Sequence, residues 1–181
     1  AGVLLHEPQA ASSAAADAAA PRVADVPLTT TGLIEVAARA VDVWPETEQA
    51  GLAELRLLVT ELPGDALAIT TSAGIAIDLD AAGHGWFVDA TPYDDEEFHR
   101  GADGRVQAVP NGPAAGRMDL ASVLAHEIGH VLGRAELDFS SEPGVRPVMA
   151  DHLDVGERRL ELGYDAGADP DVAVALAAGG G

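Results

Sequence analysis

The chain of 181 residues contains no cysteine and no lysine, so its ten basic residues are all arginine. The absence of cysteine excludes disulfide bonds, thiolate zinc ligands and thiol nucleophiles. The 30 acidic residues outnumber the arginines and give a formal net charge of -20. Binding to nucleic acid requires an excess of positive charge that neutralises phosphates. We therefore expect no nucleic-acid partner.

The sequence also has few aromatic residues and no long apolar run. Aromatic residues make up 4% of the chain and hydrophobic residues 48%, so a core must consist mainly of alanine, valine, leucine and isoleucine. No apolar run approaches the roughly 18 residues of a membrane-spanning helix. No signal peptide is visible. We expect no membrane span, and we interpret the chain as part of a larger polypeptide.

Composition divides the chain into three parts. Low-complexity alanine, serine and proline predict a flexible lead-in over residues 1–28. A single domain is expected over 29–165, since this length suits one core, and a tail over 166–181. Apolar residues at helical spacing predict a helix over 31–44, which Pro45 ends.

The middle of the chain has the patterns of strands. Residues 53–64 predict a strand that ends in a Pro-Gly turn, and residues 67–92 predict one or two more strands with glycine interruptions. Residues 93–116 are polar and rich in glycine and proline, which predicts a loop.

Two further helices are expected. Asp119 is a good N-cap for a helix that runs to about Leu132. Residues 153–162 predict a last helix, because Asp154 and Glu157 have the spacing of a capping box. One helix, several strands and two helices give the order of an α+β fold.

The predicted helix that starts at Asp119 carries the sequence HEIGH. His126 and His130 are four residues apart, so they share one helical face and can both turn a ring nitrogen toward one zinc ion. Glu127 beside them is the general base in such an arrangement and does not bind the metal. Gly133 permits the sharp turn that brings a third ligand back to the ion.

The third ligand has several candidates. Glu136 stands three residues beyond Gly133, and its carboxylate is an oxygen ligand that zinc accepts. Asp138, two residues further on, is an alternative third ligand, and His152 is another.

The stretches HEIGHVLGRAE and PVMAD resemble the metzincin zinc peptidases, and most closely the matrixin-like domains of large bacterial surface and secreted proteins. The family pattern is H-E-x-x-H-x-x-G-x-x-H/D followed by a turn that contains methionine. Four residues match its first part by type and spacing, namely His126, Glu127, His130 and Gly133. Met149 matches the Met-turn, whereas Glu136 departs from the family's histidine or aspartate.

The resemblance covers roughly residues 31–162 and implies a fold and a function. The fold is a small twisted mixed β-sheet with an N-terminal helix, an active-site helix and a C-terminal helix. The function is a secreted or cell-surface bacterial zinc endopeptidase, in which Glu127 is the general base on zinc-bound water and Met149 packs beneath the metal. A peptide or protein is the expected substrate.

A second hypothesis is a catalytically inactive metzincin-like module with a structural or interaction role in a larger surface protein. Two departures motivate it. Glu136 replaces the usual third ligand, and no first strand is evident ahead of the helix over 31–44.

The stretch DLDAAGHGWFVD raises the possibility of a structural metal. Asp78, Asp80 and Asp89 stand at positions one, three and twelve of a calcium-loop pattern, although position five is Ala82 and position twelve is not glutamate. The resemblance also implies a structural zinc or calcium in this region, for which His84 is a candidate ligand. We therefore consider Ca²⁺ or a second Zn²⁺ here, with solvated turn residues as the simpler interpretation.

Overall fold

The computed structural model describes residues 3–5, 28, 30–137 and 147–162. Its helices are α1 (Thr30–Val41), α2 (Glu46–Gln49), the short 3-10 helix η1 (Ala50–Leu52) and α3 (Leu120–Val131). Its strands are β1 (Val3–Leu5), β2 (Leu57–Thr60), β3 (Ala66–Thr71), β4 (Gly74–Asp78), β5 (Trp86–Phe87), β6 (Phe98–Arg100), β7 (Val106–Ala108), β8 (Met118–Asp119) and β9 (Glu157–Arg158).

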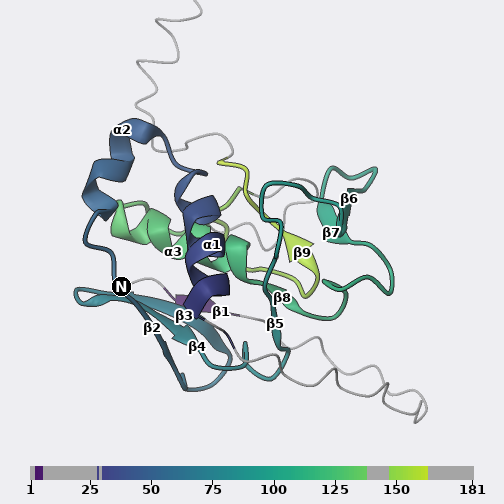
Figure 1. The fold of residues 1–181 in the computed structure, drawn as a ribbon, viewed down its shortest axis with the longest axis horizontal. Coiled ribbons are helices and arrows are strands. Elements are labelled where there is room, and N and C mark those ends of the chain that lie inside the picture. Colours follow the sequence, from purple (N-terminus) through teal and green to yellow (C-terminus); the bar gives the residue numbers. More distant parts are fainter. Residues whose placement is uncertain (1–2, 6–27, 29, 138–146, 163–181) are drawn as a thin grey trace, which may run out of the picture.

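The main sheet is small and mixed, which confirms the α+β class. Its strand order is β1-β3-β4-β2. Strands β2 and β4 are parallel, whereas β3 is antiparallel to both of its neighbours. Helix α3 lies against β3 and β4, and α1 packs on α3 (Figure 1). None of the helices in the described part of the chain has the length and apolar character that a membrane crossing needs.

Helix α1 is amphipathic, as the spacing of its apolar residues predicts. Leu33, Val36 and Ala40 are buried, three or four residues apart. The turn after the helix carries Trp44, which is also buried and whose Nε1 donates to the backbone carbonyl of Ala125 at 3.1 Å. This bond fixes the end of α1 against the middle of α3.

Helix α3 is the centre of the domain. All residues from Leu120 to Gly129 are buried, so the helix is enclosed on every side. Asp119 caps it as predicted, because its carboxylate accepts hydrogen bonds from the backbone N–H of Ser122 at 3.3 Å and from the Ser122 hydroxyl at 2.6 Å.

The prediction of a loop over residues 93–116 is wrong in part. Strands β6 and β7 form an antiparallel pair there, and β7 also pairs with β9. Phe98 at the start of β6 is buried and packs edge-on against Phe87, with ring centroids 5.6 Å apart. Phe98 thus belongs to a small apolar cluster with Phe87 and Ala114, although most of the segment is polar.

The predicted C-terminal helix over residues 153–162 is wrong. This stretch contains β9 instead, and Gly156 before it has a φ of 75°. Asp154 and Glu157, which have the spacing of a capping box, close a turn. The Asp154 N–H donates to the Glu157 carboxylate at 3.2 Å, and the Glu157 N–H donates to the Asp154 carbonyl at 3.0 Å. The same side-chain bond that can start a helix therefore starts a strand here.

The predicted flexible lead-in over 1–28 is not entirely separate from the domain. Residues 3–5 form β1 in the main sheet, so a strand does precede α1. The remainder of the low-complexity stretch and the predicted tail over 166–181 lie outside the described residues.

Arg158 joins separate parts of the chain through a buried charge. Its guanidinium donates to Asp89 at 2.7 Å, to Asp119 at 3.0 and 3.2 Å and to Asp95 at 2.8 Å. It also lies 4.1 Å from the ring centre of Phe98. Burial alone would lower the pKa of Arg158, but these carboxylates raise it above its usual value. Since Asp119 caps α3, the arginine holds the start of that helix.

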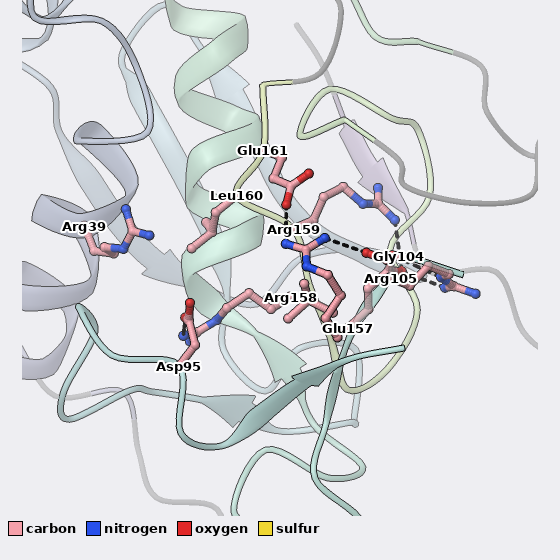
Figure 2. A pocket seen from close by; sticks show the side chains of 11 residues that line it. Arg39, Asp95, Gly104, Arg105, Glu157, Arg158, Arg159, Leu160 and Glu161 are labelled. Atoms are coloured by element: carbon pink, nitrogen blue, oxygen red, sulfur yellow. Dashed lines mark hydrogen bonds and ion pairs between the residues drawn. The ribbon is translucent and has the colours of Figure 1, made fainter. Parts of the chain in front are cut away.

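A pocket of about 210 Å³ opens beside this network. Figure 2 shows Arg105, Arg158 and Arg159 together with Asp95, Glu157 and Glu161 around it. Arg105 pairs with Asp154 and Glu157, and Arg159 donates to Glu157 at 3.0 Å. The positive charges are matched by carboxylates, so we assign this pocket to the structural network rather than to a bound anion.

We predict that Arg158→Met destabilises the fold by about 3–5 kcal/mol, because Asp89 and Asp119 would remain buried without their cation. Urea unfolding followed by circular dichroism measures this difference. Arg56→Met is the matched control, because Arg56 is exposed, and it should change stability by less than about 0.5 kcal/mol. Equal stability of the two variants would contradict the prediction.

Candidate metal centre

Three predicted ligands converge at the C-terminal end of α3. The ligand atoms of His126, His130 and Glu136 all lie within 4.8 Å of one another. The two Nε2 atoms are 3.0 Å apart, and Glu136 Oε1 is 3.8 Å from His126 Nε2. Two nitrogen ligands on a tetrahedral zinc ion lie about 3.3 Å apart at normal bond lengths. The spacing of the group therefore fits a metal ion.

The turn after α3 explains how Glu136 reaches the histidines. Gly133 has a φ of 85°, a conformation that few residues other than glycine adopt, as the sequence predicts. The N–H of Arg134 then donates to the carbonyl of Gly129 at 2.8 Å. The chain reverses beside the last turn of the helix, and Glu136 comes to lie next to His130.

The hydrogen bonds of the two histidines fix which nitrogen carries the proton. His126 Nδ1 lies 2.9 Å from the carbonyl oxygen of Val148, and His130 Nδ1 lies 3.0 Å from that of Arg134. A carbonyl oxygen only accepts, so each Nδ1 must donate. In the neutral imidazoles both Nε2 atoms are then unprotonated and face each other. Two lone pairs at this distance repel, and a cation between them would remove the repulsion.

The electrostatic setting favours a neutral ligand. Burial lowers the pKa of His126 to about 4, although its bond to the Val148 carbonyl acts in the opposite direction. The imidazole of His126 is therefore in its neutral form at neutral pH, as metal binding requires. Partial burial raises the pKa of the Glu136 carboxyl group, which His130 counteracts. A bound cation would lower the pKa of this carboxyl group.

Glu127, the predicted general base, lies at the centre of the fold. Its side chain is fully buried. Thr70 on β3 donates its hydroxyl to Glu127 Oε2 at 2.6 Å and also lies 3.0 Å from the Glu127 backbone carbonyl. The threonine therefore fixes the carboxylate between the helix and the sheet. Sequence reasoning missed Thr70, because 57 residues separate the two and no local pattern connects them.

Met149 lies under the helix turn that carries the histidines. It is buried, and a side chain added at Gly129 would collide with its Sδ atom and would lie 2.7 Å from Trp44 Cζ2. Backbone bonds hold this segment in place, since Leu137 N donates to the Met149 carbonyl at 2.8 Å and Asp151 N to the Leu137 carbonyl at 2.9 Å. The predicted Met-turn residue thus packs against the helix at Gly129, next to the candidate ligand His130.

The two alternative third ligands differ in their position. Asp138 lies outside the described residues. His152 Nε2 is 3.0 Å from Asp154 Oδ1, and His152 is not part of the group that assembles around His126.

The structure does not assemble the four predicted structural-metal residues into one ligand group, although the side chains of Asp78 and Asp80 lie close together. Asp78 accepts backbone hydrogen bonds from Leu62 and Ala82, each at 2.8 Å, and these bonds lower its pKa although burial raises it. Asp80 accepts from the N–H of Gly83 at 2.9 Å. Asp89 binds Arg158, as described above, and His84 is half-buried in a turn. Within the described residues, the assembled ligand group is the one at His126.

We predict that Gly129→Ala damages the metal centre without touching a ligand. The new methyl group must displace Met149 or Trp44, so the free energy of unfolding should fall by about 1–3 kcal/mol and the zinc affinity should fall with it. Zinc titration with a competing chelator and urea unfolding measure the two effects. Gly51→Ala is the control, because nothing lies within 4 Å of its added carbon. If both variants retain the zinc affinity and the stability of the wild type, close packing at Gly129 does not support the metal centre.

Comparison with known proteins adds no family assignment. No family model, curated protein or solved structure matches the chain. The function is therefore inferred from the geometry of the site and from the motif resemblance.

Proposed function

We propose that the chain is a zinc-dependent endopeptidase, with His126, His130 and Glu136 as metal ligands and Glu127 as general base. The observation that carries the proposal is the pair of Nε2 atoms that lie 3.0 Å apart beside a carboxylate. Each histidine has its other nitrogen bonded to a backbone carbonyl, which is the usual support of a metal-binding imidazole.

The ligand set supports zinc and leaves room for a reaction. Two histidines and one glutamate are a known catalytic zinc set, in which a fourth position stays open. Two histidines and one carboxylate also suit iron(II) in oxygenases. Glu127 favours the hydrolytic assignment, because a carboxylate next to a ligand on the same helix is placed to transfer protons.

Each residue has a distinct role in the proposed hydrolysis of a peptide bond. A zinc ion held by His126, His130 and Glu136 would supply a Lewis acid for the substrate carbonyl group and for water. Glu127 accepts a proton from the attacking water and returns it to the leaving amine. Thr70 holds one carboxylate oxygen of Glu127 and so fixes the position of the group that would transfer the proton. Met149 supports the floor of the site.

The expected setting of this activity follows from the resemblance. Matrixin-like domains of this kind belong to large bacterial surface and secreted proteins, so we propose that location, a peptide or protein substrate and a larger parent polypeptide. The strongly acidic surface supports the proposed absence of a nucleic-acid partner.

A second candidate function is a metal-binding module without catalysis. One observation favours it: Glu127 is fully buried, whereas a general base must meet its substrate. The two candidates share the metal ligands and differ in what Glu127 does.

One prediction of the proposed function concerns the metal content of the protein. Untagged protein should bind one zinc ion per chain in elemental analysis after dialysis, and Glu136→Ala should weaken zinc binding at least tenfold, because an oxygen ligand is lost. Glu61→Ala is the matched control, because Glu61 is an exposed residue of the same type. Full zinc retention by Glu136→Ala would assign the third position to Asp138 or His152. Iron in place of zinc, or no metal after incubation with excess zinc, would refute the proposal.

Another prediction distinguishes the two candidate functions. Glu127→Gln preserves the shape of the side chain and an oxygen that can accept from Thr70, so zinc content should remain unchanged. Hydrolysis of a mixed peptide substrate should fall by about 10²–10⁴-fold, since the general base is lost. The rate of peptide cleavage followed by mass spectrometry tests this. A wild-type protein that binds zinc and cleaves nothing would favour the module without catalysis.

A further inference from the structure

We infer that Glu48 on helix α2 is a positioning residue for the candidate metal centre, and that it acts on the ligand His130 through Arg134. Its effect on metal binding rests on the proposed function, because the metal itself is proposed there. Its hold on Arg134 depends on contacts between side chains and on no metal.

The turn that follows α3 contains two parts of the candidate centre. The backbone carbonyl of Arg134 accepts from His130 Nδ1 at 3.0 Å, so the position of this carbonyl sets the orientation of the ring. The N–H of Arg134 donates to the Gly129 carbonyl at 2.8 Å, and Glu136 follows two residues later. A shift of Arg134 would therefore move the ring acceptor of one ligand and the backbone of another.

The middle of this turn has little apolar packing. Gly133, Ala135 and Glu136 are exposed, whereas Leu132 and Leu137 at the two ends are partly buried against the core. Exposed segments with few buried contacts open locally at a low cost in free energy. An anchor in the middle of the turn would therefore reduce the motion of the ligands.

The side chain of Arg134 provides such an anchor. Its Nη2 donates to both carboxylate oxygens of Glu48, each at 3.0 Å, and its guanidinium carbon lies 5.9 Å from the centre of the Trp44 ring. Helix α2, which carries Glu48, lies beside the end of α3 (Figure 1). A guanidinium that contacts a carboxylate and an aromatic ring at once has a defined position.

Glu48 is itself held in place by the segment around Trp44. Its N–H donates to the Pro45 carbonyl at 2.8 Å, and Gln49 Nε2 donates to the Trp44 carbonyl at 2.8 Å. Trp44 in turn donates to Ala125 in the middle of α3. The contacts thus run from α3 through Trp44 and Glu48 to Arg134, and they return to α3 at His130.

The exposure of the ion pair indicates positioning rather than global stability. The side chains of Arg134 and Glu48 are 32% and 31% exposed, and an ion pair with this access to solvent adds little to the stability of a fold. Loss of a group that directly orients a metal ligand lowers metal affinity about 10–100-fold. Glu48 is one contact further from the ligand, so we expect a smaller effect of about fivefold.

The main experiment compares two glutamates of α2 within the full chain. Glu48→Ala should raise the Kd for zinc about fivefold, measured by competition with a chelator. The Tm of the metal-free protein should change by less than about 4 °C. Glu46→Ala is the matched control, because Glu46 is exposed and lies in the same first turn of α2, so both variants change the charge equally. Equal zinc affinity of the two variants would overturn the inference.

A double-mutant cycle tests the route through Arg134. Arg134→Met removes the guanidinium and keeps both an apolar stem beside Trp44 and the backbone carbonyl that binds His130. In this background Glu48→Ala should cause no further loss of zinc affinity, since its partner is already absent. A full fivefold loss in the Arg134→Met background would assign Glu48 another route and overturn the inference.

The ring protons of the two histidines give a readout that a general structural role would not move. In zinc-loaded protein with ¹⁵N-labelled histidine, NMR measures how fast each Nδ1 proton exchanges with water. Glu48→Ala should speed exchange at His130 about fivefold and leave His126 unchanged, because Val148 holds the ring of His126. An equal change at both histidines, or none at His130, would overturn the inference.

A measurement without metal separates this inference from the proposed function. In zinc-free Glu48→Ala, the Arg134 amide should exchange with deuterium about fivefold faster, whereas Ala108, which donates to the Gly156 carbonyl from β7, should be unaffected. Faster exchange at Arg134 in a chain that binds no zinc would support the hold of Glu48 on the turn and refute the proposed function. Unchanged exchange in a chain that binds zinc would overturn the inference alone.

Discussion

The position of the candidate metal centre depends on the ion pair between Arg158 and Asp119. Both side chains are buried, and a buried charge is tolerable only with its partner. The carboxylate of Asp119 also caps α3 through Ser122, and the Ser122 hydroxyl in turn accepts from the N–H of Arg159 at 2.6 Å. One carboxylate therefore sets where the helix begins. Because helical geometry is fixed from that point, it also sets where His126, Glu127 and His130 lie.

The opposite end of the site is held by backbone carbonyls. The Val148 carbonyl orients His126, and the next residue, Met149, packs beneath the same helix turn. The Arg134 carbonyl orients His130, and the chain then leads to Glu136. Each ligand is thus tied to a segment that also forms part of the site's wall. A change in either segment would move a ligand and its surroundings together, so the centre behaves as one unit.

The sequence predicts those parts of the fold that local patterns determine. The spacing of apolar residues places α1 and α3, a side-chain cap and a glycine mark the ends of α3, and the HEIGH motif identifies two candidate ligands and a candidate base. Contacts between distant residues are not predicted in this way. Thr70 reaches Glu127 from another strand, and Arg158 pairs with three aspartates that lie up to 69 residues away. These long-range contacts also explain the wrong helix over 153–162, because the local pattern there resembles a cap while the burial of Glu157, Arg158 and Arg159 requires an extended path.

Burial of Glu127 creates a conflict between stability and function. A general base works best when it is shielded from water, but it must still meet its substrate, and Glu127 is fully buried. A rigid wall over the site would give the first property and prevent the second. Hydrolysis at this centre would therefore require the residues that cover Glu127 to move, whereas metal binding by His126, His130 and Glu136 would not.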